Sequence, residues 1–535
     1  MLAGLLPLIL LIPFAGKAFH IDDPVYLWVA QKIHETPLDF YGFEANWYNF
    51  DEPVYKLNYN PPGTGYFLAL IALVAGWGEI GFHVGMAFCA SLFSIGTYVL
   101  SRCLTRRPLL ATCVANCTPM LVVTGTNLMT DLPMATAYVW AVAFWIYGIR
   151  QNRKSLLFAA ACCMALSPMF KYPGLNVVPL LFAFTWMKTR RIGWWSLYFL
   201  IPIVVLLTYQ MITNALYDTN LVANAIGTVF EFSRGETSPI QIGVFNGTLF
   251  VGGAIVSVLC YGPWLWSPRT VLIGFSLALV FTLGLSITLH EERGITPFLI
   301  GQGVFFFIGG IQIASLAVRD LAVRRDAEAL LLFLWVAGTF VFATMINWSV
   351  TVRILLPLLA PVAILLARRL DELEDAGYRP RRVAYALPLV ASAAISLYVG
   401  WADYCLAKAG KTAANYYAKY AADHDATVYF QGHWGFQYYM QEHGMTYFDE
   451  EISPKKGDLI VLPRLYAKMF SADADRFQMR EDLALSIPLD PRAATLNKRR
   501  GAGFYSHNFG PLPYSFGAPP AETYTVVEFI SERNQ

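Results

Sequence analysis

Two adjacent carboxylates, Asp22 and Asp23, directly follow the first long apolar run of the sequence. A carboxylate held at the edge of a membrane can take a proton from an acceptor hydroxyl. A neighbouring like charge and partial desolvation both raise its pKa toward the value that a general base needs. Either aspartate could instead cap a helix that begins near Pro24. The pair therefore predicts general-base chemistry, helix capping, or one role for each residue.

Three further ionisable residues stand at the ends of apolar runs. Asp131, in Thr130-Asp131-Leu132-Pro133, opens such a run, and helix capping is again the alternative. Lys171 and Arg353 are cations that suit an anionic group at the lipid boundary, although they could also be anchors whose charged ends reach toward water. Because charge near a bilayer is costly, we expect these residues to serve a functional site.

The composition excludes a soluble globular enzyme. Hydrophobic residues make up 56% of the 535 residues and charged residues only 14%, against roughly 25% in ordinary soluble domains. The 39 Lys and Arg residues nearly balance the 37 Asp and Glu residues, so the net charge of +2 does not favour nucleic acid as a partner. The eight cysteines, all but Cys405 inside apolar runs, are typical of small hydrophobic side chains.

Apolar runs recur from the first residue to about Trp401, and crossing a core of about 30 Å takes roughly 20 residues. The sequence therefore predicts a polytopic α-helical membrane protein with about thirteen transmembrane helices. The predicted spans are 1–19, 82–103, 109–124, 132–149, 155–170, 173–187, 193–213, 244–266, 270–289, 295–318, 328–347, 353–367 and 383–401. The apolar run 63–78 would reach only about 24 Å as a helix and is expected to lie on the membrane.

The basic residues set the predicted orientation. With thirteen spans, most Lys and Arg residues of the loops fall on one side, which the positive-inside rule assigns to the cytoplasm. Residues 1–401 then form the transmembrane domain with a cytoplasmic N-terminus, and residues 20–81 form an external loop with juxtamembrane helices. Residues 402–535 alternate short apolar stretches with a helical stretch at 435–443, which predicts a small extracytoplasmic α/β domain. Residues 1–19 could also be a signal peptide, but they lack a basic start.

Five short motifs, in this order, resemble the PMT-type glycosyltransferases of the GT-C fold, the group that includes the protein O-mannosyltransferases and the lipid A aminoarabinose transferase. The motifs are Asp22-Asp23-x-x-Tyr26, Asn60-Pro61-Pro62-Gly63, Thr130-Asp131-Leu132-Pro133, Phe170-Lys171-Tyr172-Pro173-Gly174 and Arg353-Ile354-Leu355-Leu356-Pro357. The resemblance covers roughly residues 1–400. It implies a bacterial inner-membrane enzyme that moves a sugar from a polyprenyl-phosphate carrier to an acceptor on the periplasmic face, usually with inversion.

Carried over to this sequence, the resemblance assigns Asp22 to the catalytic acidic position and Asp131 to a second acidic position at the same cavity. Asp23 falls where relatives carry Asp or Glu. Relatives in the aminoarabinose group carry an Arg and a Lys where this chain has Val25 and Asn60. Contact with the carrier phosphate must then pass to Lys171, Arg353 or a divalent cation such as Mg²⁺ or Mn²⁺. No other cofactor is implied.

Five residues near these motifs and in the C-terminal part are candidates for contact with the sugar or the acceptor: Tyr26, Tyr59, Asn60, His433 and Trp434. Aromatic rings stack on sugar faces, but they also populate the headgroup region of membranes. His433 and Trp434 could equally begin the helical stretch 435–443 and pack locally. The acceptor could be a lipid, a glycan or a protein.

Other functions stay open at the level of sequence. A lipid or sugar flippase, or a transporter, would place polar groups near span midpoints and discontinuous helices at the membrane centre. Here the acids and cations gather at span ends. An oligosaccharyltransferase with a pyrophosphate-linked donor would need a metal held by several acids, and a non-catalytic scaffold would leave the charged residues without a role. The sequence therefore favours a glycosyltransferase.

Overall fold

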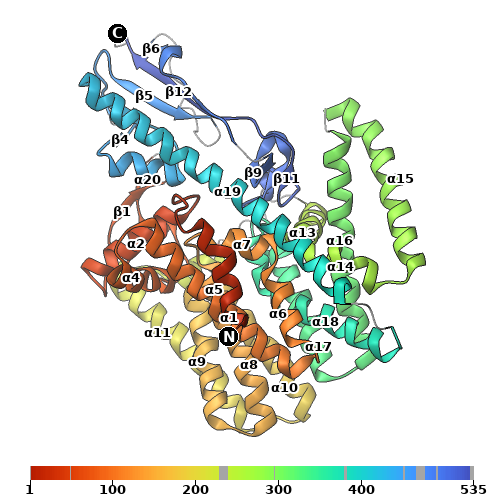
Figure 1. Ribbon diagram of the computed structural model, residues 1–535. Coiled ribbons are helices and arrows are strands. Elements are labelled where there is room, and N and C mark those ends of the chain that lie inside the picture. Colours follow the sequence, from red (N-terminus) through yellow and green to blue (C-terminus); the bar gives the residue numbers. More distant parts are fainter. Residues whose placement is uncertain are drawn as a thin grey trace.

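A body of packed helices carries a β-rich C-terminal part at one end (Figure 1). The computed structural model describes residues 2–47, 50–227, 239–293, 296–378, 382–449, 452–464, 476–489 and 492–530. Each predicted span folds as one or two helices, since a helix satisfies its own backbone hydrogen bonds, as an apolar surrounding requires. The helices of the body are α1 (Leu2–Leu11), α2 (Asp23–Glu35), α3 (Val54–Leu57), α4 (Gly63–Ala75), α5 (Glu79–Leu104), α6 (Pro108–Asn116), α7 (Pro119–Gly125), α8 (Asp131–Gln151), α9 (Lys154–Phe170), α10 (Val177–Thr189), α11 (Leu200–Tyr217), α13 (Ile240–Ala254), α14 (Val256–Leu265), α15 (Pro268–Arg293), α16 (Pro297–Arg324), α17 (Ala327–Val341), α18 (Leu359–Asp375) and α19 (Arg382–His424).

Within the described ranges, six helices are long and apolar enough to cross a membrane, and the number reaches eight if two bent pairs each count as one span. The bent pairs are α6 with α7, at 61°, and α13 with α14, at 77°. Four shorter apolar helices, of 10–17 residues, add to them: Leu2–Phe14, Gly63–Ala75, Lys154–Phe170 and Pro268–Gly284. The prediction of a polytopic helical membrane protein is confirmed, and the count of thirteen spans stays a prediction.

The break between α6 and α7 has a local cause. Pro119 has no backbone N–H to donate and opens α7, while the Thr118 side chain accepts a hydrogen bond from the Leu121 N–H and caps the new helix. One apolar run therefore folds as two short helices. The loop that follows α7 carries Asn127, Leu128 and Met129, which contact several residues of the site described below.

The predicted external loop, residues 20–81, folds against the ends of the body helices. Its helices α2 and α4 pack on each other, and a two-stranded antiparallel sheet joins β1 (Glu44–Asn46) to β2 (Asp51–Pro53). At 13 residues, α4 is about 20 Å long, which is shorter than the hydrocarbon core. Its position on the membrane surface stays a prediction.

The C-terminal part is built on a six-stranded sheet of order β4-β3-β5-β12-β6, with β7 also paired to β12. Strand β3 runs parallel to β4 and β5, whereas β12 runs antiparallel to β5, β6 and β7. A helix, α20 (Trp434–Glu442), connects β3 to β4 and matches the helix predicted at 435–443. The strands are β3 (Val428–Phe430), β4 (Thr446–Tyr447), β5 (Leu459–Pro463), β6 (Phe477–Met479), β7 (Leu485–Ile487) and β12 (Glu522–Phe529).

Between β7 and β12 the chain returns to the helical body, and we call residues 492–517 the return segment. It contains two small antiparallel pairs, β8 (Ala493–Ala494) with β11 (Ser515–Phe516) and β9 (Leu496–Asn497) with β10 (Ala502–Gly503). Helix α19 runs without a break through the boundary expected at residues 401 and 402, from the body to the sheet (Figure 1). The two predicted domains therefore share one long helix.

Candidate active site

Two ion pairs bring four of the predicted site residues together. Arg353 Nη2 lies 2.7 Å from Asp22 Oδ2, and Lys171 Nζ lies 2.8 Å from Asp131 Oδ1. Each cation also interacts electrostatically with the acid of the other pair. We call Asp22, Asp131, Lys171 and Arg353 the quartet. Residues more than 300 positions apart in the sequence thus form one charged cluster.

Each member of the quartet stands at a helix end. Asp22 precedes α2, Asp131 opens α8, Lys171 follows α9, and Arg353 opens the short 3-10 helix η5 (Arg353–Leu358). The Asp22 side chain makes no capping hydrogen bond, and Thr130 occupies the cap position of α8. Helix capping therefore does not account for Asp22 or Asp131.

The two acids of the quartet differ in their access to solvent. The Asp22 side chain is 29% exposed, whereas that of Asp131 is fully buried. Asp131 Oδ2 has no hydrogen-bond partner among the described residues. Burial lowers the pKa of Lys171, and the adjacent Asp131 carboxylate opposes that shift. The quartet thus offers one accessible carboxylate and one buried carboxylate oxygen whose hydrogen-bonding capacity is unused.

Asp23 has a different environment from Asp22. It is fully buried, and its two oxygens accept hydrogen bonds from the His20 N–H at 2.9 Å and the Leu128 N–H at 2.7 Å. Burial raises the pKa of Asp23 to about 7, although Lys17 and both hydrogen bonds act in the opposite direction. Because Leu128 lies three residues before Asp131, Asp23 joins the start of α2 to the loop that leads to the second acid.

Tyr26 lies beside the quartet, and the Asn60 motif lies close to Lys171. Tyr26 is buried in the first turns of α2 and interacts electrostatically with Asp22, Arg353 and Asp131. A Cβ on Gly63 would come within 2.5 Å of the Met169 carbonyl oxygen, so Gly63 permits α4 to begin against the end of α9, two residues before Lys171.

Asn60 and Tyr59 take part in contacts of their own loop. The Asn60 side chain donates to Asn58 Oδ1 at 3.2 Å, and the Asn60 carbonyl accepts a hydrogen bond from the Tyr41 hydroxyl. Tyr59 is partly buried against the hydrophobic core. Within the described part of the chain, the hydrogen bonds of Asn60 do not reach the quartet. Their predicted contact with sugar or acceptor stays a prediction.

His433 and Trp434 lie at the start of α20, against the loop that carries Asp22. The centroids of the Trp434 and His20 rings lie 6.4 Å apart, and those of the His433 ring and the Trp47 ring of the external loop lie 5.9 Å apart. A Cβ on Gly435 would overlap the Phe19 carbonyl oxygen, so only glycine permits this close approach. Trp434 has φ +66°, a left-handed conformation that is uncommon for a tryptophan. The expected alternative of purely local packing is therefore incomplete.

The sequence reasoning missed a second buried ion pair. Lys17 Nζ lies 2.5 Å from Asp403 Oδ2 on α19, and both side chains are fully buried. Asp403 also accepts hydrogen bonds from Thr495 at 2.6 Å and Tyr505 at 2.7 Å, in the return segment. Lys17 donates to Asn127 Oδ1 at 2.7 Å. The available signal was one charge inside the apolar run 1–19 and another two residues past the run 383–401, because charges so close to lipid need partners.

The donor set does not suit a divalent cation. In the ranges that the structure describes, no group of three or more His, Cys, Asp and Glu side chains could hold a metal ion. The two carboxylates of the quartet already face Lys171 and Arg353, whose positive charges would oppose a bound cation. Dependence on Mg²⁺ or Mn²⁺ stays a prediction.

The apolar helices and the charged cluster at their ends define a membrane protein with a polar site at one end of its helical body. Residues 59–217, less than a third of the chain, match the family model described as dolichyl-phosphate-mannose-protein mannosyltransferase. The matched region contains Asn60, Asp131 and Lys171, while Asp22 and Arg353 lie outside it. The match confirms the resemblance to PMT-type glycosyltransferases for this part of the chain.

Several solved structures are similar to this chain. The oligosaccharyltransferase of Archaeoglobus fulgidus with a tethered acceptor peptide is 13% identical, with a TM-score of 0.48 over 84% of this chain and 63% of that chain. ArnT from Cupriavidus metallidurans bound to undecaprenyl phosphate is 16% identical, with a TM-score of 0.46 over 90% of this chain and 95% of that chain. The mycobacterial arabinofuranosyltransferase AftD is 12% identical, with a TM-score of 0.41 over 99% of this chain and 40% of that chain.

The chain spans less than two thirds of the length of the oligosaccharyltransferase. With TM-scores below 0.5, these similarities do not define its site. No curated protein matches the sequence.

Proposed function

We propose that this protein is a GT-C glycosyltransferase that moves a sugar from a polyprenyl-phosphate carrier to an acceptor at the extracytoplasmic face of the membrane. The observation that supports it most is the quartet, in which two acids and two cations meet at helix ends. A phosphate leaving group needs cations, and displacement at the anomeric carbon needs a base. The quartet supplies both. The matched family is described by a lipid-phosphate sugar donor, which agrees with this substrate class.

The ion pairs suggest how the chemistry begins. The carrier phosphate competes for Arg353 and Lys171, and its arrival releases Asp22 from Arg353 as a free carboxylate. Asp22 then takes the proton of the acceptor hydroxyl while that oxygen bonds to the anomeric carbon. The bond from the anomeric carbon to the phosphate oxygen breaks, and its electron pair leaves with the phosphate, which the two cations stabilise. Attack opposite the leaving group inverts the anomeric carbon.

Asp131 and Asp23 have supporting roles in this proposal. Asp131 holds Lys171 with one oxygen and offers the other to the acceptor. Asp23 positions the loop between α7 and α8 through its bond to the Leu128 N–H. Tyr26 borders the quartet, and His433 with Trp434 covers the loop that carries Asp22. Tyr26, His433 and Trp434 are candidates for contact with the sugar or the acceptor.

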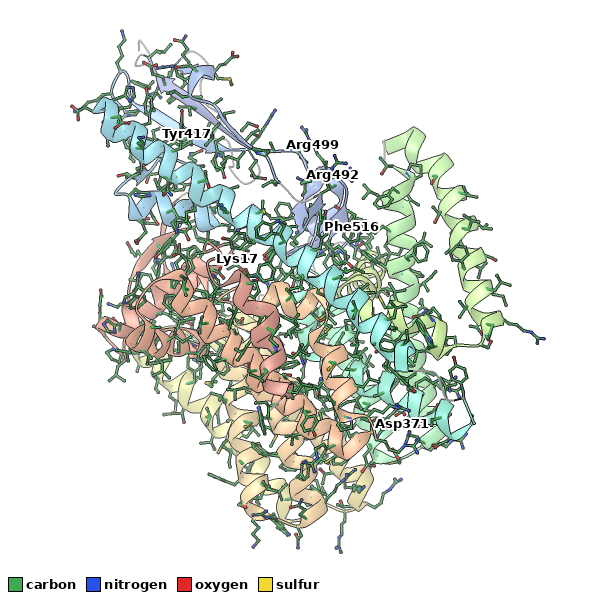
Figure 2. All side chains as sticks on the ribbon, in the orientation of Figure 1. Lys17, Asp371, Tyr417, Arg492, Arg499 and Phe516 are labelled. Carbon is green, nitrogen blue, oxygen red and sulfur yellow. The ribbon has the colours of Figure 1, made fainter. Side chains whose placement is uncertain are left out.

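The basic residues of the opposite loops support the proposed orientation. Arg107 pairs with Asp371 and Glu374, and Arg150 and Lys188 both pair with Glu328. Figure 2 shows Asp371 at the end of the body away from Lys17, which lies near α19 and the return segment. A cytoplasmic position for the basic loops would place the quartet at the other face of the bilayer.

The transporter alternative receives one point of support. It predicts discontinuous helices, and the structure contains two bent pairs. The breaks, however, fall at Cys117–Thr118 and at Ile255, which carry no charge. The charged residues of the quartet lie at helix ends instead. The arrangement therefore favours transfer chemistry over transport.

Replacing the proposed base tests the function. We expect Asp22→Asn to lower sugar transfer by about 10²–10⁴-fold, the contribution of a general base. Membranes that contain the protein are supplied with polyprenyl-phosphate sugars labelled in the sugar, and transferred label is measured. Asp423→Asn, at an exposed aspartate near the end of α19, is the matched control and should transfer at the wild-type rate.

Transfer by Asp22→Asn at the wild-type rate would remove Asp22 from the mechanism. Loss of wild-type transfer in EDTA, restored by Mg²⁺ or Mn²⁺, would favour the metal-dependent oligosaccharyltransferase alternative. Export or import of the labelled lipid without transfer would favour a flippase.

A further inference from the structure

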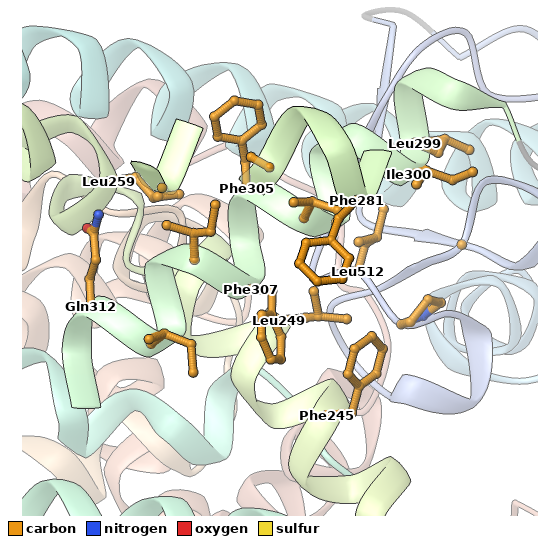
Figure 3. Close-up of a pocket in the computed structure, with 18 of the residues that line it drawn as sticks. Phe245, Leu249, Leu259, Phe281, Leu299, Ile300, Phe305, Phe307, Gln312 and Leu512 are labelled. Atoms are coloured by element: carbon orange, nitrogen blue, oxygen red, sulfur yellow. The ribbon is translucent and has the colours of Figure 1, made fainter. Parts of the chain in front are cut away.

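A large apolar cavity lies between α13, α14, α15 and α16, next to the return segment. Its volume is about 1270 Å³, above the roughly 300–1,000 Å³ of sites for drug-sized ligands. Figure 3 shows Phe245, Leu249, Phe281, Phe307 and Leu512 turned into it. The cavity therefore has the size and lining of a site for long hydrocarbon chains.

One side of the cavity is strongly basic. Lys498, Arg499 and Arg500 line it from the return segment, three consecutive cations on a 3-10 turn. The Arg500 guanidinium donates to the Phe516 carbonyl at 2.7 Å. Lys498 and Arg499 are exposed, and neither forms an ion pair with any described residue. Two uncompensated cations beside an apolar cavity complement a ligand that joins a negative headgroup to apolar chains.

The surface around the cavity is suited to lipid. Between residues 272 and 283, helix α15 exposes large apolar side chains, among them Leu272, Phe275 and Val280, each more than half exposed. In Figure 1, α15 and α16 form a hairpin beside the main body, and Figure 2 places Arg499 in the return segment next to it. A lipid can therefore enter from the bilayer with its headgroup at the cations.

The cavity is separate from the quartet, since none of the four quartet residues lines it. The two are nevertheless connected. His507, at the cavity, accepts a hydrogen bond from the Val350 N–H at 3.1 Å, and the Val352 N–H donates to the Phe504 carbonyl at 2.9 Å. Residues 350–352 lead directly to Arg353. A lipid in the cavity would therefore act on the return segment, which is hydrogen-bonded to residues 350–352, directly before Arg353.

We propose that the cavity binds an anionic phospholipid of the bilayer, with its acyl chains among α13–α16 and its phosphate on Lys498 and Arg499. This site is distinct from the carrier phosphate site at Lys171 and Arg353. The proposal does not depend on the transfer reaction, because it concerns binding alone.

Native mass spectrometry of the delipidated full-length protein tests this site. Phosphatidylglycerol should bind at least tenfold more tightly than phosphatidylcholine. The double variant Lys498→Gln/Arg499→Gln should lose that preference, roughly fivefold for each cation. Lys455→Gln/Lys456→Gln, two exposed lysines elsewhere in the C-terminal part, is the matched control and should bind as the wild type does. Equal binding of both lipids to the wild type would overturn the proposal.

A second pair of variants tests the cavity itself. A Cβ on Gly274, in the cavity wall, would meet nothing within 4 Å, so Gly274→Trp should be accommodated, fill the space and weaken phosphatidylglycerol binding at least tenfold. Gly284→Trp, on the same helix but outside the cavity, is the control. Unchanged binding to Gly274→Trp would overturn the proposal. The proposal would also be overturned if Gly274→Trp weakened binding of polyprenyl phosphate but not of phosphatidylglycerol.

Discussion

At the scale of the residue, the neighbouring Asp22 and Asp23 have different roles because their side chains lie in different surroundings. Asp22 is partly exposed and faces a guanidinium, while Asp23 is buried and accepts two backbone N–H groups. We expect Asp23→Asn to destabilise the protein, since an amide offers one accepting oxygen and leaves a buried N–H unpaired, at a cost of about 1–3 kcal/mol. Thermal unfolding in detergent measures the difference.

Asp22→Asn is the control for that comparison. It should unfold within a degree or two of the wild type, because its position is partly exposed and the amide oxygen can still accept from Arg353. Equal losses of thermal stability in the two variants would contradict the separation of roles. A stable Asp23→Asn protein that has lost transfer would instead make Asp23 a direct participant.

The quartet shows how much of the site the residue types alone could predict. Asp22, Asp131, Lys171 and Arg353 stand beside apolar runs, and the cost of charge near lipid made them recognisable. Which acid pairs with which cation depends on where four helix ends meet, and no local pattern contains that information. The pair Lys17 and Asp403 was missed because each charge sits alone among apolar residues, nearly 400 positions apart.

At the scale of the element, close contacts between helices set the position of the site. The start of α4 touches the end of α9 at Gly63, where a Cβ would press on the Met169 carbonyl at 2.5 Å. We expect Gly63→Ala to push these helix ends apart and to displace Lys171, two residues beyond Met169. Transfer should fall by about tenfold or more, because small misplacement of binding groups is costly in catalysis.

Gly78→Ala is the control for Gly63→Ala. A Cβ there meets nothing within 4 Å, and Gly78 has an extended backbone that alanine adopts. This variant should keep wild-type transfer. If Gly63→Ala also transfers at the wild-type rate while remaining folded, the contact between α4 and α9 does not position Lys171.

Helices and strands were largely predictable, whereas their interruptions were not. Each apolar run of the first 400 residues is helical, and α20 lies where its pattern placed it. The bend of 77° between α13 and α14 and the continuation of α19 past residue 401 escaped prediction. In α19 the apolar sequence ends at the expected boundary, but the helix continues past it. The same helical backbone can carry apolar side chains in lipid and polar side chains in water.

At the scale of the whole molecule, the ion pair between Lys17 and Asp403 joins three parts of the fold. Lys17 follows α1 and its 3-10 extension, Asp403 lies on α19, and Thr495 and Tyr505 belong to the return segment. Asn127, which is hydrogen-bonded to both Lys17 and Tyr505, belongs to the loop that leads to Asp131. The C-terminal part is therefore coupled to the candidate active site through one buried cluster.

Breaking this cluster should loosen the C-terminal part from the helices. Asp403→Asn leaves the Lys17 charge buried without a counter-charge, and such a loss costs about 3–5 kcal/mol. We expect a marked fall in thermal stability and faster proteolysis within the return segment. The double variant Lys17→Met/Asp403→Leu should recover most of the stability, because replacing both partners by apolar side chains is often neutral. Asp423→Asn, exposed on the same helix, should behave as the wild type. If Asp403→Asn alone were as resistant to protease as the wild type, the ion pair would not hold the return segment in place.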